Sequence, residues 1–384
     1  MKAILIAAAL ACAPPALAGQ VTAAPYGATK SGEVVTAYTL TNDRGASATI
    51  LDFGGTVTDL RMPDRDGKFA NVVMSFQGME AWETLHAANG IVGRVANRVS
   101  NGFSLDGVRY DLAPTSPNGV TMHSGPPFYA TRLWTVTPVK AGDGAALTLR
   151  LDSPDGDQGL PGHVRITAVY RLTNDNALRL DFSATTDKAT PINLDNHLYV
   201  NLAGADQASV ATHELQINTD RMANEAPGAA TASLPVAGTP FDFRRPTLLR
   251  TRLAFADSDR WDDQTKAPPP PPGQAGFFSV GYWLRDGDNR LDRVAARLHD
   301  PASGRVLEVR TTEISVHIYT PIKMAATLRS ERGRPFTRVP AIAIETQHLP
   351  DSPNRPDFPS VILRPGQTFH STTVFAFGTD RGRR

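Results

Sequence analysis

Cysteine is almost absent from this chain of 384 residues, and the single one, Cys12, lies near the N-terminus. Residues 1–18 begin with a positive charge at Lys2, continue as an apolar run and end in the small-residue sequence Ala16–Ala18. The pattern predicts a signal peptide cleaved after Ala18, because the apolar run is too short to span a bilayer. The mature protein would then be periplasmic or secreted and would hold no disulfide. Lipid attachment at Cys12 is the alternative.

A surplus of charge is absent too. The 39 Lys and Arg residues balance 38 Asp and Glu residues, so the chain has no basic excess of the kind that nucleic acid requires. The sequence also lacks a glycine-rich phosphate loop, the HExxH zinc pattern and the GxSxG nucleophile elbow. Its nine histidines are scattered, and no membrane-spanning run follows the signal. These absences predict a protein with no nucleic-acid partner, no metal and no cofactor.

Helical periodicity is scarce, and period-two alternation of apolar and polar residues takes its place. The clearest alternating segments are 147–152, 164–172, 178–184 and 314–319. Alternation is typical of half-buried strands, and many short strands separated by turns predict an all-β sandwich or barrel. One short helix is expected within 78–89. The five prolines within 266–273 predict an exposed loop in a single domain that spans 19–384, because proline donates no backbone hydrogen bond.

One histidine stands in an unusual run, Pro191–Leu202, which alternates like a sheet strand. His197 is flanked there by Asn193, Asn196 and Asn201. Asparagine is depleted in strands because its side chain competes for backbone hydrogen bonds. The run therefore predicts a strand whose polar face lines a pocket. A core histidine satisfied by its asparagine neighbours is the alternative.

Three further polar islands interrupt the apolar pattern. Arg94 and Asn97 lie three residues apart after a glycine, and the fork of donors on an arginine suits the hydroxyls of a polyol. His123 lies on a loop followed by small residues and two prolines. Glu345 ends a strongly apolar strand, where a carboxylate is costly unless it is paired or functional. A surface arginine and a solvent-facing loop histidine are the alternatives at Arg94 and His123.

The chemistry available from these islands is one carboxylate and one or two imidazoles. At neutral pH a glutamate can take a proton, and a histidine, which titrates nearby, can give one. This set favours general acid–base catalysis without a covalent intermediate.

In this order, the islands resemble the aldose 1-epimerases, or galactose mutarotases, from about Leu51 to the end of the chain. Each segment resembles one element of the family's pattern. They are Gly93–Arg98 (GRxANR), His123–Gly125 with Arg132–Trp134 (HGG…RxW), Ser153–Gly162 (SPDGxxGxPG), Thr185–Lys188 (TTDK), Asn193–Leu202 (NLxNHxYxNL), Gly238–Arg244 (GTPFDFR) and Glu345–Asn354 (ETQHxPDxPN).

The resemblance implies a large antiparallel β-supersandwich with an open site for a monosaccharide, usually galactose or glucose, and it implies no oligomeric state. Glu345 would be the base that deprotonates the 1-hydroxyl, and His197 the acid that protonates the ring oxygen. Arg94 and Asn97 would bind the sugar, and His123 would hydrogen-bond near C1. The ring would open, the C1–C2 bond would rotate, and the ring would close on the other face.

One position departs from the family pattern. An aspartate that binds sugar hydroxyls is usual in a YDH-type element, and Ser279 aligns with it here. Asp262, Asp263 and Asp286 are candidate substitutes. The departure puts sugar selectivity in question, because a changed hydrogen-bonding position alters discrimination strongly.

Two alternative functions remain open. The first, which this departure motivates, is a sugar-binding protein without catalysis. The second is another carbohydrate enzyme, such as a glycoside hydrolase, a hexose-phosphate epimerase or another epimerase of altered sugar specificity. A hydrolase would need two carboxylates around one bond, and only Glu345 stands out.

Overall fold

The computed structural model describes residues 19–115, 119–205, 209–224, 232–253, 278–285, 287, 289–321, 324, 327–337 and 339–382. The predicted signal peptide with Cys12 and the proline-rich loop at 266–273 lie outside these residues. In the described part of the chain, none of the helices combines the length and the apolar character needed to cross a membrane.

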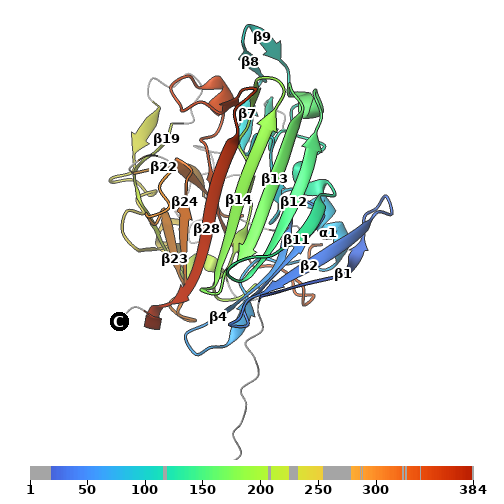
Figure 1. Ribbon diagram of the computed structural model, residues 1–384. Coiled ribbons are helices and arrows are strands. Elements are labelled where there is room, and N and C mark those ends of the chain that lie inside the picture. The colour runs from blue at the N-terminus through green and yellow to red at the C-terminus, as the bar shows by residue number, and fades with distance from the viewer. Residues whose placement is uncertain are drawn as a thin grey trace, which may run out of the picture.

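Antiparallel pairing joins most of the described strands into three larger sheets (Figure 1). The nine-stranded sheet runs β11 (Thr135–Val139), β12 (Ala145–Ser153), β13 (Val164–Leu172), β14 (Ala177–Thr186), β28 (Phe369–Thr379), β24 (Arg305–Thr311), β23 (Ala296–His299), β18 (Glu214–Ile217) and β21 (Thr247–Leu248). The six-stranded sheet runs β17 (Tyr199–Val200), β26 (Ile342–Gln347), β25 (Ser315–Tyr319), β22 (Ser279–Leu284), β19 (Thr219–Ala223) and β20 (Ser233–Pro235). The five-stranded sheet runs β1 (Gln20–Ala28), β2 (Val34–Thr41), β3 (Ser47–Leu51), β4 (Val57–Pro63) and β5 (Phe69–Asn71).

Smaller elements complete the described fold. The two-stranded pairs are β7 (Arg98–Ser100) with β10 (Val120–Met122), β15 (Thr190–Pro191) with β27 (Ile362–Leu363), β16 (Asp195–Asn196) with β6 (Ile91–Val92), and β8 (Phe103–Leu105) with β9 (Val108–Tyr110). The helices are α1 (Gly78–Thr84) and α2 (Arg250–Leu253), and short 3₁₀ turns cover Tyr129–Thr131, Asp157–Gly159, Val210–Thr212, Ser352–Asn354 and Asp380–Gly382. The all-β prediction and the helix expected within 78–89 are both confirmed.

Alternation explains the long strands of the nine-stranded sheet. In β13 every second residue, from Val164 to Leu172, is buried, and the residues between them are exposed or half-buried. Its partner β14 places Phe182 opposite Ala168 and Leu180 opposite Tyr170, so apolar side chains meet on one face. This is the pattern of a sheet with one face against the core.

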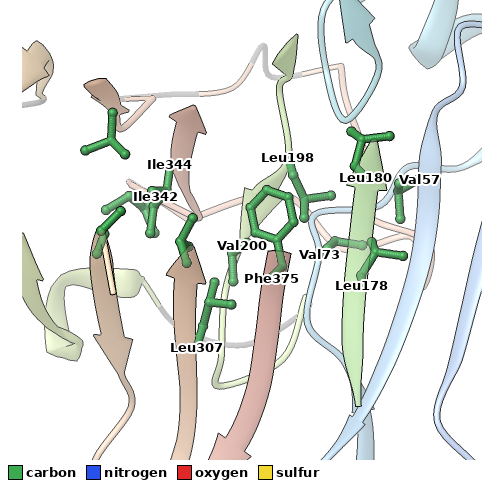
Figure 2. Close-up of a cluster of buried hydrophobic side chains, with 14 of the residues drawn as sticks. Val57, Val73, Leu178, Leu180, Leu198, Val200, Leu307, Ile342, Ile344 and Phe375 are labelled. Atoms are coloured by element: carbon green, nitrogen blue, oxygen red, sulfur yellow. The ribbon is translucent and has the colours of Figure 1, made fainter. Parts of the chain in front are cut away.

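The core lies between the nine-stranded sheet and the two other large sheets, the six-stranded and the five-stranded one. Figure 2 shows side chains from the first sheet meeting side chains from β26 and β17. They include Leu178, Leu180, Leu307 and Phe375 on one side and Ile342, Ile344 and Val200 on the other. Each fully buried side chain of this size contributes about 1.5–3 kcal/mol. Ile342 and Ile344 point into this core. Because successive side chains of a strand point to opposite faces, Glu345 lies on the other face of β26.

Two strand predictions need correction. The run 191–202 is not one strand: β15, β16 and β17 are separate two-residue pieces, which pair with β27, β6 and β26 respectively. The chain passes from one layer to the next here, and His197 falls between β16 and β17. The strand β25 is not half-buried, because its alternating polar residues Ser315 and His317 are buried along with Val316 and Ile318. The face of β25 that carries Ser315 and His317 is therefore buried as well, and the candidate site lies on that face.

Candidate active site

Glu345 and His197, 148 positions apart in the chain, meet in the structure. The His197 Nε2 atom lies 3.4 Å from the Glu345 Oε1 atom, and both side chains are almost fully buried. The other carboxylate oxygen, Oε2, accepts a hydrogen bond of 2.9 Å from the Gln347 side-chain amide. The pair has the geometry of a neighbouring acid and base.

The backbone around His197 is fixed by the segment that precedes β6. The His197 N–H donates to the Gly90 carbonyl at 3.0 Å, and the His197 carbonyl accepts from the Asn89 N–H at 2.9 Å. The asparagines around His197 bind other groups: the Asn196 side chain donates to the Asn89 carbonyl, and the Asn201 side chain donates to the Pro340 carbonyl. Asn193 exchanges hydrogen bonds with the backbone of His348. They hold the loop in place, and Nδ1 of His197 is buried without a hydrogen bond among the described residues.

Burial moves the pKa values of the two groups in opposite directions. It raises the pKa of Glu345 to about 8, against the opposing effects of the Gln347 hydrogen bond and the Arg98 charge. Burial and, to a smaller extent, the charge of His86 lower the pKa of His197 to about 4, against the opposing effect of a backbone hydrogen bond. Between these values the pair holds one proton, and the two shifts favour Glu345 as the group that carries it. One shared proton is what an acid–base pair needs if one member is to accept while the other donates.

His123 lies next to this pair, against the ring of His197. Its ring lies edge-to-face against the His197 ring, with 5.6 Å between centroids. Its Nδ1 atom accepts a hydrogen bond of 3.2 Å from the Asn97 backbone N–H, which leaves the proton on Nε2. Burial, and then the charges of His197 and other neighbours, lower the pKa of His123 well below its usual value. His123 is therefore a neutral donor at neutral pH.

Asn97 acts on the site through its neighbours. Besides its backbone contact to His123, its side-chain oxygen accepts a hydrogen bond of 3.1 Å from Nε of Arg98. Arg98 is half-buried, and its charge acts on Glu345, His123 and His317. Arg98 is thus the guanidinium at the site. The sequence offered one signal for it, its place directly after Asn97.

Arg94 occupies a different place from the one expected. It is fully buried, and its Nη1 atom donates to the Pro161 carbonyl at 2.7 Å and to the Thr190 hydroxyl at 3.1 Å. Its Nη2 atom donates to the Ser153 hydroxyl at 2.7 Å, and its Nε atom to the Tyr129 hydroxyl at 3.4 Å. The donors of the fork are committed to the protein, so we assign Arg94 a structural role rather than contact with a sugar.

Aromatic rings border the pair, and nothing in the sequence pattern singled them out. The rings of Tyr199 and Tyr319 lie 4.7 Å and 5.9 Å from the His197 ring. Tyr319 lies two residues after His317 on β25 and so shares its face of the strand, which pairs with β26. Among the described residues, no three His, Cys, Asp or Glu side chains are grouped to hold a metal ion.

Comparison with known proteins assigns a family to this arrangement. The family model described as "Aldose 1-epimerase" matches residues 36–376. The chain belongs to the aldose 1-epimerase family. It is 32% identical to the galactose mutarotase of Rattus norvegicus over 350 residues, covering 90% of this chain and 95% of that one. It is 34% identical to the aldose 1-epimerase of Escherichia coli K12, covering 88% and 94% of the two chains.

Solved structures of aldose 1-epimerase type share the fold. An aldose epimerase homologue from C. elegans superposes with a TM-score of 0.74 at 26% identity, covering 94% of this chain and 99% of the other. The galactose 1-epimerase of Lactobacillus acidophilus superposes with a TM-score of 0.76 at 24% identity, with the same coverage. The prediction of a galactose mutarotase-like β-supersandwich is confirmed.

The position that departs from the aldose 1-epimerase pattern lies beside the pair. Ser279 begins β22, and its hydroxyl lies 3.2 Å from Nε2 of His317 on the neighbouring strand β25. His317 in turn stands directly opposite Glu345 across β25 and β26. The candidate substitutes Asp262, Asp263 and Asp286 lie outside the described residues. Finding the Ser279–His317 contact needed the register of three strands, which the sequence does not reveal.

Proposed function

We propose that this protein interconverts the α and β anomers of a free aldohexose of the galactose or glucose type, with Glu345 as general base and His197 as general acid. The observation that carries the proposal is the 3.4 Å approach of the His197 Nε2 atom to the Glu345 Oε1 atom. The names of the relatives, galactose mutarotase and aldose 1-epimerase, support the same reaction.

The reaction follows from the position of the two oxygens involved. The 1-hydroxyl and the ring oxygen of an aldose are bonded to the same carbon, so neighbouring acid and base groups can reach both. In the form of the pair that holds its proton on His197, Glu345 takes the proton of the 1-hydroxyl while His197 gives its proton to the ring oxygen, and the bond between C1 and the ring oxygen breaks. The product is the open-chain aldehyde with a free 5-hydroxyl.

Closure returns the protons by the same route. After rotation about C1–C2, the 5-hydroxyl attacks the other face of the carbonyl and gives its proton to His197. Glu345 returns its proton to the carbonyl oxygen. The pair holds one proton before, during and after the cycle, so no net proton is exchanged with solvent.

The other groups of the site fit this scheme as binding groups. The Nε2 hydrogen of His123 is available to an oxygen near C1, where negative charge develops as the 1-hydroxyl loses its proton. Arg98 supplies a guanidinium for sugar hydroxyls, and Asn97 positions both residues.

Substitution of the pair tests the proposal. Glu345→Gln keeps the size of the side chain, and His197→Asn leaves a smaller polar one. Both remove the proton chemistry, so each should lower the rate of anomer exchange by roughly 10²–10⁴-fold. Polarimetry on freshly dissolved α-D-galactose and α-D-glucose measures that rate. Circular dichroism and the thermal unfolding midpoint serve as controls for folding.

Two outcomes would count against the proposal. Exchange at the wild-type rate in both folded variants would refute the assigned roles. Saturable sugar binding by the wild type with no acceleration of exchange would favour the alternative, a sugar-binding protein without catalysis.

A further inference from the structure

Among the described residues, one permanent positive charge lies near the candidate pair, the guanidinium of Arg98, which acts on Glu345, His123 and His317. The imidazoles of His197, His123 and His317 are buried, and burial lowers the pKa of each, so they add no permanent charge. His86, stacked on Phe128 with 4.0 Å between ring centroids, is a further imidazole whose pKa burial lowers. The carboxylate opposite His317 is the base itself, Glu345.

A second buried carboxyl group, Asp195, lies close to Glu345. Its Oδ1 atom accepts hydrogen bonds from the backbone and the hydroxyl of Thr346. Burial and then the charge of Glu345 raise the pKa of Asp195 well above its usual value, which disfavours its ionised form. A third, Glu313, acts on Asp195 and is paired with His348 at 2.8 Å, and Arg98 is the guanidinium whose charge acts on the base.

Ser279 and His317 form a neutral pair at the position where the resemblance described above implies a sugar-binding aspartate. Both side chains are more than nine-tenths buried, and their contact of 3.2 Å leaves Nδ1 of His317 without a hydrogen bond among the described residues. The pair offers a hydroxyl and an imidazole beside Glu345. A permanent negative charge is replaced by groups that can donate as well as accept.

We propose that this site turns over hexuronates, which are aldoses with a carboxylate at C6, and that the Ser279–His317 pair permits it. An aspartate at this position would repel the substrate carboxylate, and exclusion by like charge is a common means of selectivity. Ser279 removes that repulsion, while Arg98 supplies attraction. The inference rests on the proposed anomer exchange, since a hexuronate has the same C1 and ring oxygen as a hexose.

The test compares anomer exchange of charged and neutral sugars by two-dimensional exchange NMR on the full chain. The probes are D-galacturonate and D-glucuronate against D-galactose and D-glucose. The wild type should exchange a hexuronate with a kcat/KM at least equal to that of its neutral counterpart. Raising the ionic strength should lower the hexuronate value more, because salt screens the attraction of an anion to the site.

A matched pair of variants separates charge from size. Ser279→Asp should lower the ratio of hexuronate to hexose kcat/KM by about tenfold or more, because close like charges oppose binding strongly. Ser279→Asn has nearly the same shape without the charge and should retain most of the wild-type ratio. Equal ratios in the two variants would overturn the role of the pair.

Failure of the inference and failure of the proposed function give different results. Exchange of galactose or glucose without exchange of either hexuronate would overturn the inference and leave the function standing. No exchange of any probe would overturn the function itself. Exchange of glucose 6-phosphate in place of the hexuronates would also overturn the inference, because it would show a site built for a phosphate.

Discussion

Two arginines four residues apart, Arg94 and Arg98, have opposite surroundings. Arg94 is fully buried and donates to Ser153 and Pro161 at the two ends of one loop and to Thr190. Arg98 is half-buried, begins β7, and acts by its charge on the base Glu345. Residue type and motif are the same in both cases, so the partners that the fold supplies decide the role.

The two arginines of this motif therefore serve different properties: Arg94 serves the stability of the fold, and Arg98 serves catalysis. Arg94 ties the Ser153–Pro161 loop to the strand at Thr190, and Ser153 and Arg132 in turn bind Asp157 in that loop. Arg98 is linked through Asn97 to His123, and thus to the reaction centre. Substituting the same residue at both positions should therefore damage two different properties.

Arg94→Met should cause the largest effect, a loss of folding stability. The substitution leaves the Pro161 carbonyl and the hydroxyls of Ser153 and Thr190 without their donor, and each unsatisfied buried group costs about 1–3 kcal/mol. We expect a loss of about 3 kcal/mol or more, measured from the midpoint of urea unfolding. The kcat/KM of the fraction that remains folded should stay near the wild-type value. A stable Arg94→Met variant with a raised KM would restore the sugar-binding role that the sequence predicted.

Arg98→Met should cause the intermediate effect, on activity. A hydrogen bond to a charged group is worth about 1.5–3 kcal/mol, so we expect kcat/KM for galactose to fall by roughly 10- to 100-fold. Unfolding free energy should change by about 1 kcal/mol or less, because the side chain is half-buried. Polarimetry and urea unfolding on the same preparation check both numbers. If Arg98→Met were as unstable as Arg94→Met, the separation of roles would fail.

The fold was largely predictable because its signals are local. Alternation in 164–172 specified a strand with one buried face, and β13 has that pattern. The run 191–202 was misread because alternation does not report which strand lies alongside. Its three pieces pair with β27, β6 and β26, which are distant in the sequence. Only the tertiary contacts break the run into three.

The candidate site was predictable where a residue conflicted with its local context. Glu345 stood out because a carboxylate at the end of an apolar strand needs a reason, and the structure brings His197 to it. Arg94 and Arg98 gave no such conflict, since an arginine suits a turn or a surface. The Ser279–His317 contact depends on register between β22 and β25, which no short motif encodes.

The smallest of the expected differences between the two arginine variants lies in the pH profile of kcat/KM. The wild type should show a bell, with an acid limb near the His197 pKa of about 4 and an alkaline limb near the Glu345 pKa of about 8. Below the first value the pair holds two protons, and above the second it holds none. Only the form with one proton between the two groups can pass it from oxygen to oxygen.

Removing the Arg98 charge should move one limb only. That charge lowers the pKa of Glu345, so Arg98→Met should raise this pKa and shift the alkaline limb to higher pH. The acid limb should stay, because the charge that acts on His197 is that of His86. In Arg94→Met neither limb should move, since the charge of Arg94 acts on Tyr129, Asp155 and Asp157. Rates measured from pH 4 to pH 10 at constant ionic strength test both predictions. An equal shift of the alkaline limb in the two variants would contradict them, because it would mean that the place of an arginine in the motif, and not its proximity to Glu345, sets the shift.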